Sequence, residues 1–325
     1  MASPVYVEDR EFIITGSIGV AGYPDDGIST DTLLSNADAA MYLAKQVGKN
    51  TYRFYTEGMN ERAAERLAME SRLRRALPKN ELYIAYQPKV DLKSGYITGA
   101  EALLRWENDE LGAVSPAEFI PLAEESGQIL EIGEWVLRQV CHDLHTLDKN
   151  GFGDERIAVN ISSRQIRRED FARQLTGILR EYKVEPTRLK IEITESLLLS
   201  EDSHTIEVLQ ALRRMGVELS LDDFGTGYSS LSYLKRFPFT EIKIDRSFIR
   251  DIESDHSDKQ LCQAIIAMAT SLKLKVVGEG VENHGQLDFL RNYGAHSGQG
   301  FLFSKPVRID EFITLIERGP FPLSA

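Results

Sequence analysis

Residues 217–230 read VELSLDDFGTGYSS, and this stretch decides the fold. The apolar run at 217–221 is typical of a buried strand, and two adjacent aspartates, Asp222 and Asp223, end it. The glycines behind them let the backbone turn sharply before a helix that a serine caps. A strand that ends in acids and turns through glycines into a helix is typical of one βα unit in an α/β protein.

Strands and helices continue to alternate on both sides of this unit. Strand patterns, apolar or alternating and bounded by turn residues, occur at residues 82–90, 97–103, 156–160, 189–193, 217–221, 241–244, 275–278 and 299–303. Helical patterns, with apolar residues spaced for one face, occur at residues 116–126, 133–147, 165–182, 202–215, 229–237, 258–272, 286–293 and 309–316. Strands that alternate with helices in this way predict a closed (β/α)8 TIM-like barrel.

The first two barrel strands depart from the regular pattern. Only residues 91–96 connect them, with Lys93, Ser94 and Gly95 as the turn. A parallel crossover needs about a dozen residues or more, so this connection is too short for one. We therefore predict a barrel with an antiparallel first strand.

The N-terminal part of the chain is a small α/β segment. Strand patterns at 12–20 and 51–55 flank a helical pattern at 32–46. These elements are too few to bury a core, so the segment is a remnant or packs on something else. A charge-rich helical pattern at 57–77, ended by Pro78, is typical of a connecting helix. We divide the chain into a remnant at 1–56, a connecting helix at 57–78 and a barrel at 79–325.

The charge of the chain bears on its partners. The formal net charge is −12 over 325 residues. Non-specific binding of long nucleic acid depends on lysine and arginine neutralising phosphates, so we expect no such partner. A small anionic substrate remains compatible where metal ions supply positive charge locally.

Cysteine usage and hydropathy bear on the compartment. Cys141 and Cys262 stand far apart without metal-like spacing, which suits a reducing compartment. No apolar run approaches the roughly 20 residues that span a bilayer, and the N-terminus lacks a signal pattern. We expect a cytoplasmic chain without a membrane segment, or the cytoplasmic part of a larger sensory protein.

Polar residues fall at or near the ends of most expected strands. They are Glu101, Asn160, Glu192, Asp222, Asp223, Lys243, Glu279 and, at the start of the last strand, Gln299. Taken singly, an acid near a strand end is usually a helix cap or a surface residue. In a barrel, however, the strand carboxyl ends converge on one face, where active sites form. The recurrence from strand to strand therefore predicts a site on that face.

The donor atoms of this set indicate hard metal ions. The carboxylates and the amide would repel or lack partners unless cations sat between them. All donors are oxygens, and no histidine or cysteine joins them at a plausible spacing, so Mg²⁺ or Mn²⁺ fits and zinc does not. The adjacent Asp222 and Asp223 suit two ions that share a carboxylate, an arrangement that serves phosphoester chemistry. Lys243, the lone cation of the set, orients a water or pairs structurally with one of the acids.

Several motifs follow one another along the barrel: YQPKVDL, GAEALLRW, FIPLAEESG, NISSRQ, IEITES, DDFGTGYSSLSYL, KIDRSFI, GEGVE and QGF, in that order. With these motifs, about residues 67–306 resemble the EAL-domain cyclic di-GMP phosphodiesterases. The first segment, with SIGVAGYPDDG, LLSNADAAMYLAKQVGKN and YRFY, resembles the C-terminal part of a GGDEF diguanylate cyclase domain. The cyclase signature loop and nucleotide-binding half are absent from this sequence, so we expect no synthesis of cyclic di-GMP.

The resemblance implies a role for each matching residue. It implies that one metal is held by Glu101, Asn160, Glu192 and Asp222, and a second by Asp222 and Asp223. It makes Lys243 the group that positions the attacking water. Glu279 is then a base or an aid to the second metal and its water. With Glu101, these two residues form the expected catalytic set.

Further positions match substrate and regulatory residues of that family. Those implied to contact the dinucleotide are Gln87, Leu103, Arg105 and Gln299. Those implied to act in loop regulation and dimer contacts are Glu195, which anchors the loop, and Phe224, Gly225, Thr226 and Gly227. The resemblance thus implies a homodimer.

The activity expected from the resemblance is metal-dependent hydrolysis of cyclic di-GMP to linear pGpG. A metal-activated water would attack one phosphorus in line and displace the 3′ oxygen. An alternative is an inactive receptor that binds cyclic di-GMP without turnover, although such members usually lack metal ligands that are all present here. A third possibility is that the N-terminal segment inhibits the barrel or props it in a dimer.

Overall fold

The computed structural model describes residues 4–7, 10–13, 15–46, 50–199, 203–225, 234 and 236–323. They form two compact units, one up to Arg75 and one from Ala76 onward. Each unit is described by itself. None of the helices within the described ranges combines the length and the apolar character that a membrane-spanning helix requires.

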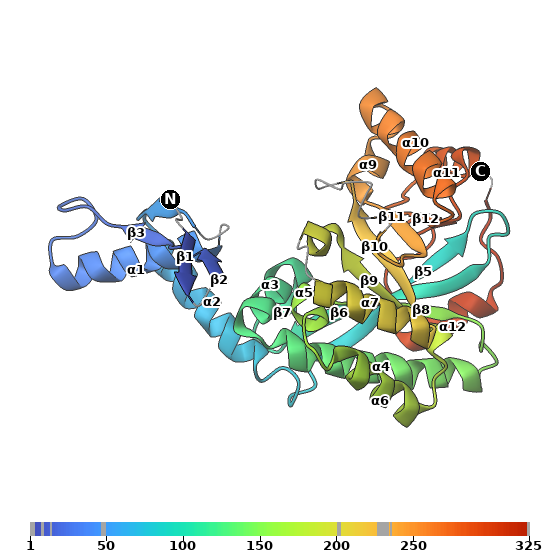
Figure 1. The fold of residues 1–325 in the computed structure, drawn as a ribbon, viewed down its shortest axis with the longest axis horizontal. Helices are drawn as coiled ribbons and strands as arrows, with labels where there is room; N and C mark the ends of the chain where they lie inside the picture. Colours follow the sequence, from blue (N-terminus) through green and yellow to red (C-terminus); the bar gives the residue numbers. More distant parts are fainter. Residues whose placement is uncertain are drawn as a thin grey trace. The chain divides into compact units, whose positions relative to one another are not determined.

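Within the described ranges of the second unit, eight strands close a barrel (Figure 1). In spatial order they are β5 (Leu82–Asp91), β13 (Ser297–Gly298), β12 (Lys275–Gly278), β11 (Glu241–Ile244), β10 (Glu218–Phe224), β9 (Leu189–Thr194), β8 (Arg156–Asn160) and β6 (Ile97–Asn108). Pairing between β5 and β6 closes the ring. The predicted barrel is confirmed.

Strand β5 is the antiparallel member of the barrel. It pairs antiparallel with β6 and with β13, whereas β6 to β8, β8 to β9 and the following pairs up to β13 are parallel. This confirms the antiparallel first strand. A short strand that the sequence analysis did not predict, β7 (Gly112–Val114), pairs with the far end of β6. The side chain of Asn108 accepts two backbone N–H groups in the connecting turn and so stabilises this hairpin.

Helices cover the outside of the barrel (Figure 1). They are α3 (Pro116–Ser126), α4 (Ile129–Lys149), α5 (Ser163–Ile166), α6 (Phe171–Tyr182), α7 (Ser203–Met215), α9 (Arg246–Arg250), α10 (His256–Ser271), α11 (His284–Tyr293) and α12 (Ile309–Glu317). The single helix expected at 165–182 is two helices, because a capping box of Ser162 and Gln165 starts the short α5 and the chain turns before α6. Most of the helix expected at 229–237 lies outside the described residues.

The barrel strands alternate between apolar and polar residues, and the alternation places the site. On β9 and β10, Ile191, Ile193, Leu219 and Leu221 are at most 1% exposed. Burial of one such side chain contributes roughly 1.5–3 kcal/mol. Because successive strand residues point to opposite faces, the residues between them, such as Glu192, point to the barrel interior.

The last barrel strand differs from the expectation at 299–303, which is wrong. The strand is β13, and Gln299 follows it: its N–H donates to Gly278 O at 2.9 Å and its carbonyl accepts from Val281 at 3.0 Å. Gly300 then packs so closely that an added Cβ would lie 2.2 Å from backbone atoms of Val281. A turn therefore replaces the strand, and Gln299 lies just past a strand carboxyl end.

The N-terminal unit contains two small sheets and two helices within the residues described. Its elements are β1 (Pro4–Val7), β2 (Arg10–Ile13), β3 (Ile18–Val20), α1 (Thr30–Gln46), β4 (Tyr52–Phe54) and α2 (Met59–Leu73). β1 pairs antiparallel with β2, and β3 pairs parallel with β4. The strand expected at 12–20 is therefore two strands, and β1 was not predicted. Met59 of α2 packs on Ala39 and Ala40 of α1 and forms a small apolar cluster.

Candidate metal centre

Four carboxylates surround Lys243 on β11 at one end of the barrel. Its Nζ lies near one oxygen of each: Glu101 Oε2 at 3.1 Å, Glu192 Oε2 at 2.7 Å, Asp222 Oδ1 at 3.0 Å and Glu279 Oε1 at 2.6 Å. Lys243 is 1% exposed. The structure thus brings together residues that are up to 178 positions apart in the sequence, from Glu101 to Glu279.

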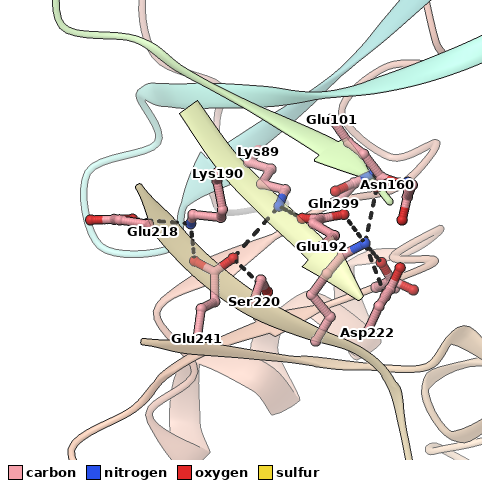
Figure 2. A network of polar contacts seen from close by, with 12 residues as sticks. Lys89, Glu101, Asn160, Lys190, Glu192, Glu218, Ser220, Asp222, Glu241 and Gln299 are labelled. Carbon is pink, nitrogen blue, oxygen red and sulfur yellow. Dashed lines mark hydrogen bonds and ion pairs between the residues drawn. The ribbon is translucent and has the colours of Figure 1, made fainter. Parts of the chain in front are cut away.

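Two side-chain amides donate hydrogen bonds to Glu101. Asn160 Nδ2 donates to Glu101 Oε1 at 2.6 Å, and Gln299 Nε2 donates to Glu101 Oε2 at 2.7 Å. Gln299 also donates to Gln87 Oε1 at 3.0 Å. Figure 2 shows Asn160 and Gln299 close to Glu101. These contacts fix both oxygens of the carboxylate.

The sequence analysis expected Glu101 at a strand end, but the residue lies inside its strand. It is the fifth residue of β6, which continues to Asn108 because its far half pairs with β5 and with β7. Glu101 still reaches the site because it lies level with Ala158, two residues before β8 ends at Asn160. The stagger of the strands, rather than the end of β6, places this residue.

A bulge brings both aspartates of β10 to one side. In a regular strand, Asp222 and Asp223 would point to opposite faces. The pairing of β10 with β11 shifts register between Leu221 and Phe224, and Asp223 adopts a left-handed φ of 54°. Both aspartates consequently line the same cleft.

The carboxylates form two groups that can hold a divalent metal ion. One group consists of Glu101, Glu192 and Asp222, and the other of Asp222, Asp223 and Glu279. Within each group one oxygen per residue lies within 4.8 Å of the others. Asp222 belongs to both groups, as a bridging ligand would. Clustered carboxylate oxygens suit hard divalent cations, so the residues present fit the expected metal.

Burial shapes the charge of this cluster. Burial raises the pKa of Asp222 to about 7 against the opposing effect of Lys243, and burial raises the pKa of Glu279 well above its usual value. Burial also disfavours the charged form of Glu192, but Lys243 and Lys89 outweigh this and lower its pKa to about 2. The single positive charge of Lys243 is too little to balance the carboxylates of the cluster, and a divalent cation would supply the rest.

Residues of the carboxylate cluster line two hollows. A cleft of about 300 Å³ is lined by Gln87, Glu101, Asp222, Asp223, Lys243, Arg246, Glu279, Gly280, Glu282, Gln299, Gly300 and Phe301. A more apolar hollow of about 360 Å³ includes Leu103, Arg105, Asn160 and Glu192 in its lining. The expected substrate residues are therefore divided, with Gln87 and Gln299 in the first hollow and Leu103 and Arg105 in the second.

The expected regulatory residues are partly described. Glu195 lies in a short 3-10 helix, η2 (Glu195–Leu199), and is 4% exposed. Its Oε2 accepts the backbone N–H of Gly225 at 3.1 Å, next to the buried Phe224. Thr226 and Gly227 lie outside the described residues.

A second buried ionic layer behind the cluster was missed by the sequence analysis. Figure 2 shows Lys89 between Glu192 and Glu241, and Lys190 between Glu241 and Glu218. A signal for it exists in the sequence. Lys190 precedes Glu192 by two residues, and Glu241 precedes Lys243 by two, so the period of a strand puts each pair on the same interior face.

The structure is an α/β barrel with two carboxylate groups, clustered at one end, that could hold divalent metal ions. Residues 70–306 match the family described as "EAL domain", and residues 1–51 match "Diguanylate cyclase, GGDEF domain". The chain belongs to the EAL domain family and has a GGDEF fragment at its N-terminus. The resemblance stated from the motifs is confirmed.

Curated relatives and solved structures agree with this assignment. Over 316 residues the chain is 42% identical to the bifunctional diguanylate cyclase/cyclic di-GMP phosphodiesterase MucR of Pseudomonas aeruginosa, covering 97% of this chain and 46% of MucR. It is 41% identical to the cyclic di-GMP phosphodiesterase NbdA of the same organism, covering 96% of this chain and 40% of NbdA. The chain thus spans less than half the length of these relatives.

Among solved structures, the PaMucR phosphodiesterase in its c-di-GMP complex is similar, with a TM-score of 0.73 and 42% identity. The similarity covers 75% of this chain and 99% of that one. The EAL domain of Mycobacterium smegmatis DcpA has a TM-score of 0.64 and 33% identity, covering 75% of this chain and 99% of that one.

Proposed function

We propose that this chain is a divalent-metal-dependent phosphodiesterase that hydrolyses cyclic di-GMP to linear pGpG. The observation that supports it most strongly is the set of four carboxylates whose oxygens surround the buried Lys243, next to a cleft that three of them line. Similarity to relatives named cyclic di-GMP phosphodiesterases, and to a structure of one in complex with c-di-GMP, supports this choice of substrate.

The proposed cofactor is a pair of Mg²⁺ or Mn²⁺ ions. Glu101, Asn160, Glu192 and Asp222 would hold one ion, and Asp222 and Asp223, aided by Glu279, the other. The two carboxylate groups that share Asp222 support this division. When bound, such ions supply a nucleophile from water at neutral pH and stabilise the charge that develops on the phosphoryl group.

Lys243 and Glu279 then act on the reacting atoms. Lys243 donates through Nζ to the attacking water and holds it in line with the phosphorus, since its contacts already direct Nζ into the carboxylate cluster. Glu279 accepts a proton from that water, as a buried carboxylate with a raised pKa is suited to do. The water oxygen bonds to phosphorus, the bond from phosphorus to the 3′ oxygen breaks, and the 3′ oxygen takes up a proton.

Other residues would bind the substrate or regulate the site. Gln87, Gln299, Leu103 and Arg105 would contact the dinucleotide, two in each hollow. We also propose that Glu195, Phe224, Gly225, Thr226 and Gly227 form a regulatory loop, supported so far by the hydrogen bond from Gly225 to Glu195.

We also propose an oligomeric state, a location and a domain division for this chain. The enzyme would act as a homodimer in the cytoplasm. The chain would divide into the GGDEF remnant at 1–56, a connecting helix at 57–78 and the phosphodiesterase barrel at 79–325. The separation into units at Arg75 and Ala76 supports a division near the connecting helix.

A matched pair of variants on one strand tests the proposal. Glu101→Gln keeps the shape of a buried ligand but removes its charge, whereas Glu107→Gln alters an exposed glutamate of the same strand. Linear product is measured by chromatography after incubation with cyclic di-GMP and Mg²⁺. We expect Glu101→Gln to abolish product and Glu107→Gln to leave it unchanged. Undiminished turnover by Glu101→Gln would contradict the metal-ligand role, and tight binding without turnover by the parent would indicate a receptor.

A further inference from the structure

A buried lysine lies directly behind the metal ligands. Lys89, on the antiparallel strand β5, is 5% exposed and reaches into the barrel interior. Its Nζ forms an ion pair with Glu192 Oε1 and lies 3.6 Å from Glu241 Oε1 (Figure 2). It contacts a metal ligand from the side opposite to the cleft, so it is not one of the cleft-lining residues.

The two oxygens of Glu192 have different partners. Oε2 accepts from Lys243 at 2.7 Å and so points into the carboxylate cluster. Oε1 accepts from Lys89. Glu192 is 0% exposed, so solvent cannot replace a lost donor to either oxygen. A buried carboxylate oxygen without a partner is unfavourable, and rotation of the carboxylate would then relieve it at the expense of Oε2.

Lys89 is itself held in place by Glu241, whose carboxylate has further partners. Glu241 Oε2 accepts from Lys190 at 2.5 Å, and Glu241 Oε1 accepts from Ser220 Oγ at 3.2 Å. Lys190 lies on β9 and Ser220 on β10, so contacts from two other strands fix the position of Glu241 on β11 and, through it, the ammonium group of Lys89. A rigid donor of this kind can define the plane of the Glu192 carboxylate.

We propose that Lys89 is a positioning residue that holds Oε1 of Glu192 so that Oε2 stays directed at the metal centre. The inference rests on the proposed metal site. Lys243 cannot serve this purpose alone, because its Nζ is shared among four carboxylates. Groups that orient metal ligands from outside the coordination sphere typically change metal affinity or activity by about 10–100-fold when they are removed.

Lys190 offers a matched control inside the same barrel. It is a buried lysine that pairs with Glu241 and Glu218, and within the described part of the chain it forms no hydrogen bond or ion pair with a proposed metal ligand. Lys89→Met and Lys190→Met therefore remove the same charge from the same interior and differ in whether Glu192 loses a donor. A double variant, Lys89→Met with Glu241→Gln, removes a buried pair of opposite charges and serves if Lys89→Met does not fold.

The experiment is calorimetric titration of Mn²⁺ into the parent and the variants in the absence of substrate. We expect Lys89→Met, or the double variant, to bind Mn²⁺ roughly 10–100-fold more weakly than the parent. Lys190→Met should weaken Mn²⁺ binding much less than Lys89→Met does, because Lys190 reaches Glu192 only through Glu241 and Lys89. Affinity unchanged in a folded Lys89 variant, or lost equally in Lys190→Met, would overturn the inference.

A second readout uses turnover of cyclic di-GMP against Mg²⁺ concentration. A positioning defect should raise the Mg²⁺ concentration needed for half-maximal rate, and excess Mg²⁺ should restore kcat. A loss of kcat that excess Mg²⁺ does not restore contradicts the positioning role. The Mn²⁺ titration does not depend on turnover. A parent that binds Mn²⁺ but does not hydrolyse cyclic di-GMP would refute the proposed function. The titration would still test the role of Lys89 in that case.

Discussion

Replacing Lys243 by methionine should destabilise the metal-free protein while making it respond more strongly to metal. The lysine contacts four carboxylates at 2.6–3.1 Å in the barrel interior and is the nearest positive charge to each of those oxygens. Removal of one partner from a buried ion pair typically costs about 3–5 kcal/mol. Because burial already raises the pKa of Asp222 and Glu279, protons can replace part of the missing charge. We therefore expect the lower end, about 3 kcal/mol, of this range.

This loss of unfolding free energy can be measured as a lower melting temperature. For a domain of this size, 1 kcal/mol corresponds to about 2–4 °C, so Lys243→Met should melt roughly 6–12 °C below the parent in chelator. Lys243 also repels cations from the cluster, and its loss should tighten metal binding. Tenfold tighter binding adds about 1.4 kcal/mol to the stabilisation by metal.

Thermal melts in chelator and in saturating Mg²⁺ test both parts. Lys149→Met, a change at an exposed lysine of α4, is the control and should melt like the parent in both buffers. Hydrolysis by Lys243→Met should fall by about 100-fold or more even with metal bound, because the group that holds the water is lost. A variant that melts with the parent in chelator, or gains no more from Mg²⁺ than the parent does, would refute this reasoning.

Three further outcomes are expected. Glu195→Ala removes the acceptor of the Gly225 N–H and should lower kcat by roughly 10–100-fold through displacement of the loop, whereas Glu195→Gln should retain most of the rate. Tyr86→Phe deletes the 2.6 Å hydrogen bond to buried Asp143; urea unfolding should show a loss of about 1–3 kcal/mol, with kcat unchanged. Removal of metal from the parent should lower its melting temperature by roughly 5–11 °C relative to Mg²⁺ at 100 times Kd; no shift would argue against a metal site.

Much of the barrel could be predicted from the sequence because its strands have a simple pattern. Residues such as Ile191 and Ile193 must be apolar to pack under the helices, and the residue between them is free to be Glu192. The same alternation makes the site recognisable in the sequence, because polar residues are conspicuous in an otherwise apolar strand. The short connection after β5 predicted the antiparallel strand for a steric reason that needs no structure.

The elements that were missed depend on tertiary contacts. The apolar residues after Gly300 resemble a strand, but the close approach of Gly300 to Val281 makes them a turn. The placement of Glu101 depends on the stagger between β6 and β8, and that of Asp223 on a bulge, and neither leaves a local signal. The burial of Lys89 could not be predicted, because a lysine in a strand ordinarily faces solvent. In this barrel Glu192 and Glu241 compensate for its burial.

The most direct measurement is chromatography of cyclic di-GMP after incubation with the parent protein in Mg²⁺, in Mn²⁺ and in chelator. Metal-dependent hydrolysis at the Lys243 cluster predicts linear pGpG with at least one of the two metals and none in chelator. Product formed equally in chelator would contradict the metal requirement. Intact cyclic di-GMP with both metals, from a protein that binds them, would contradict the activity.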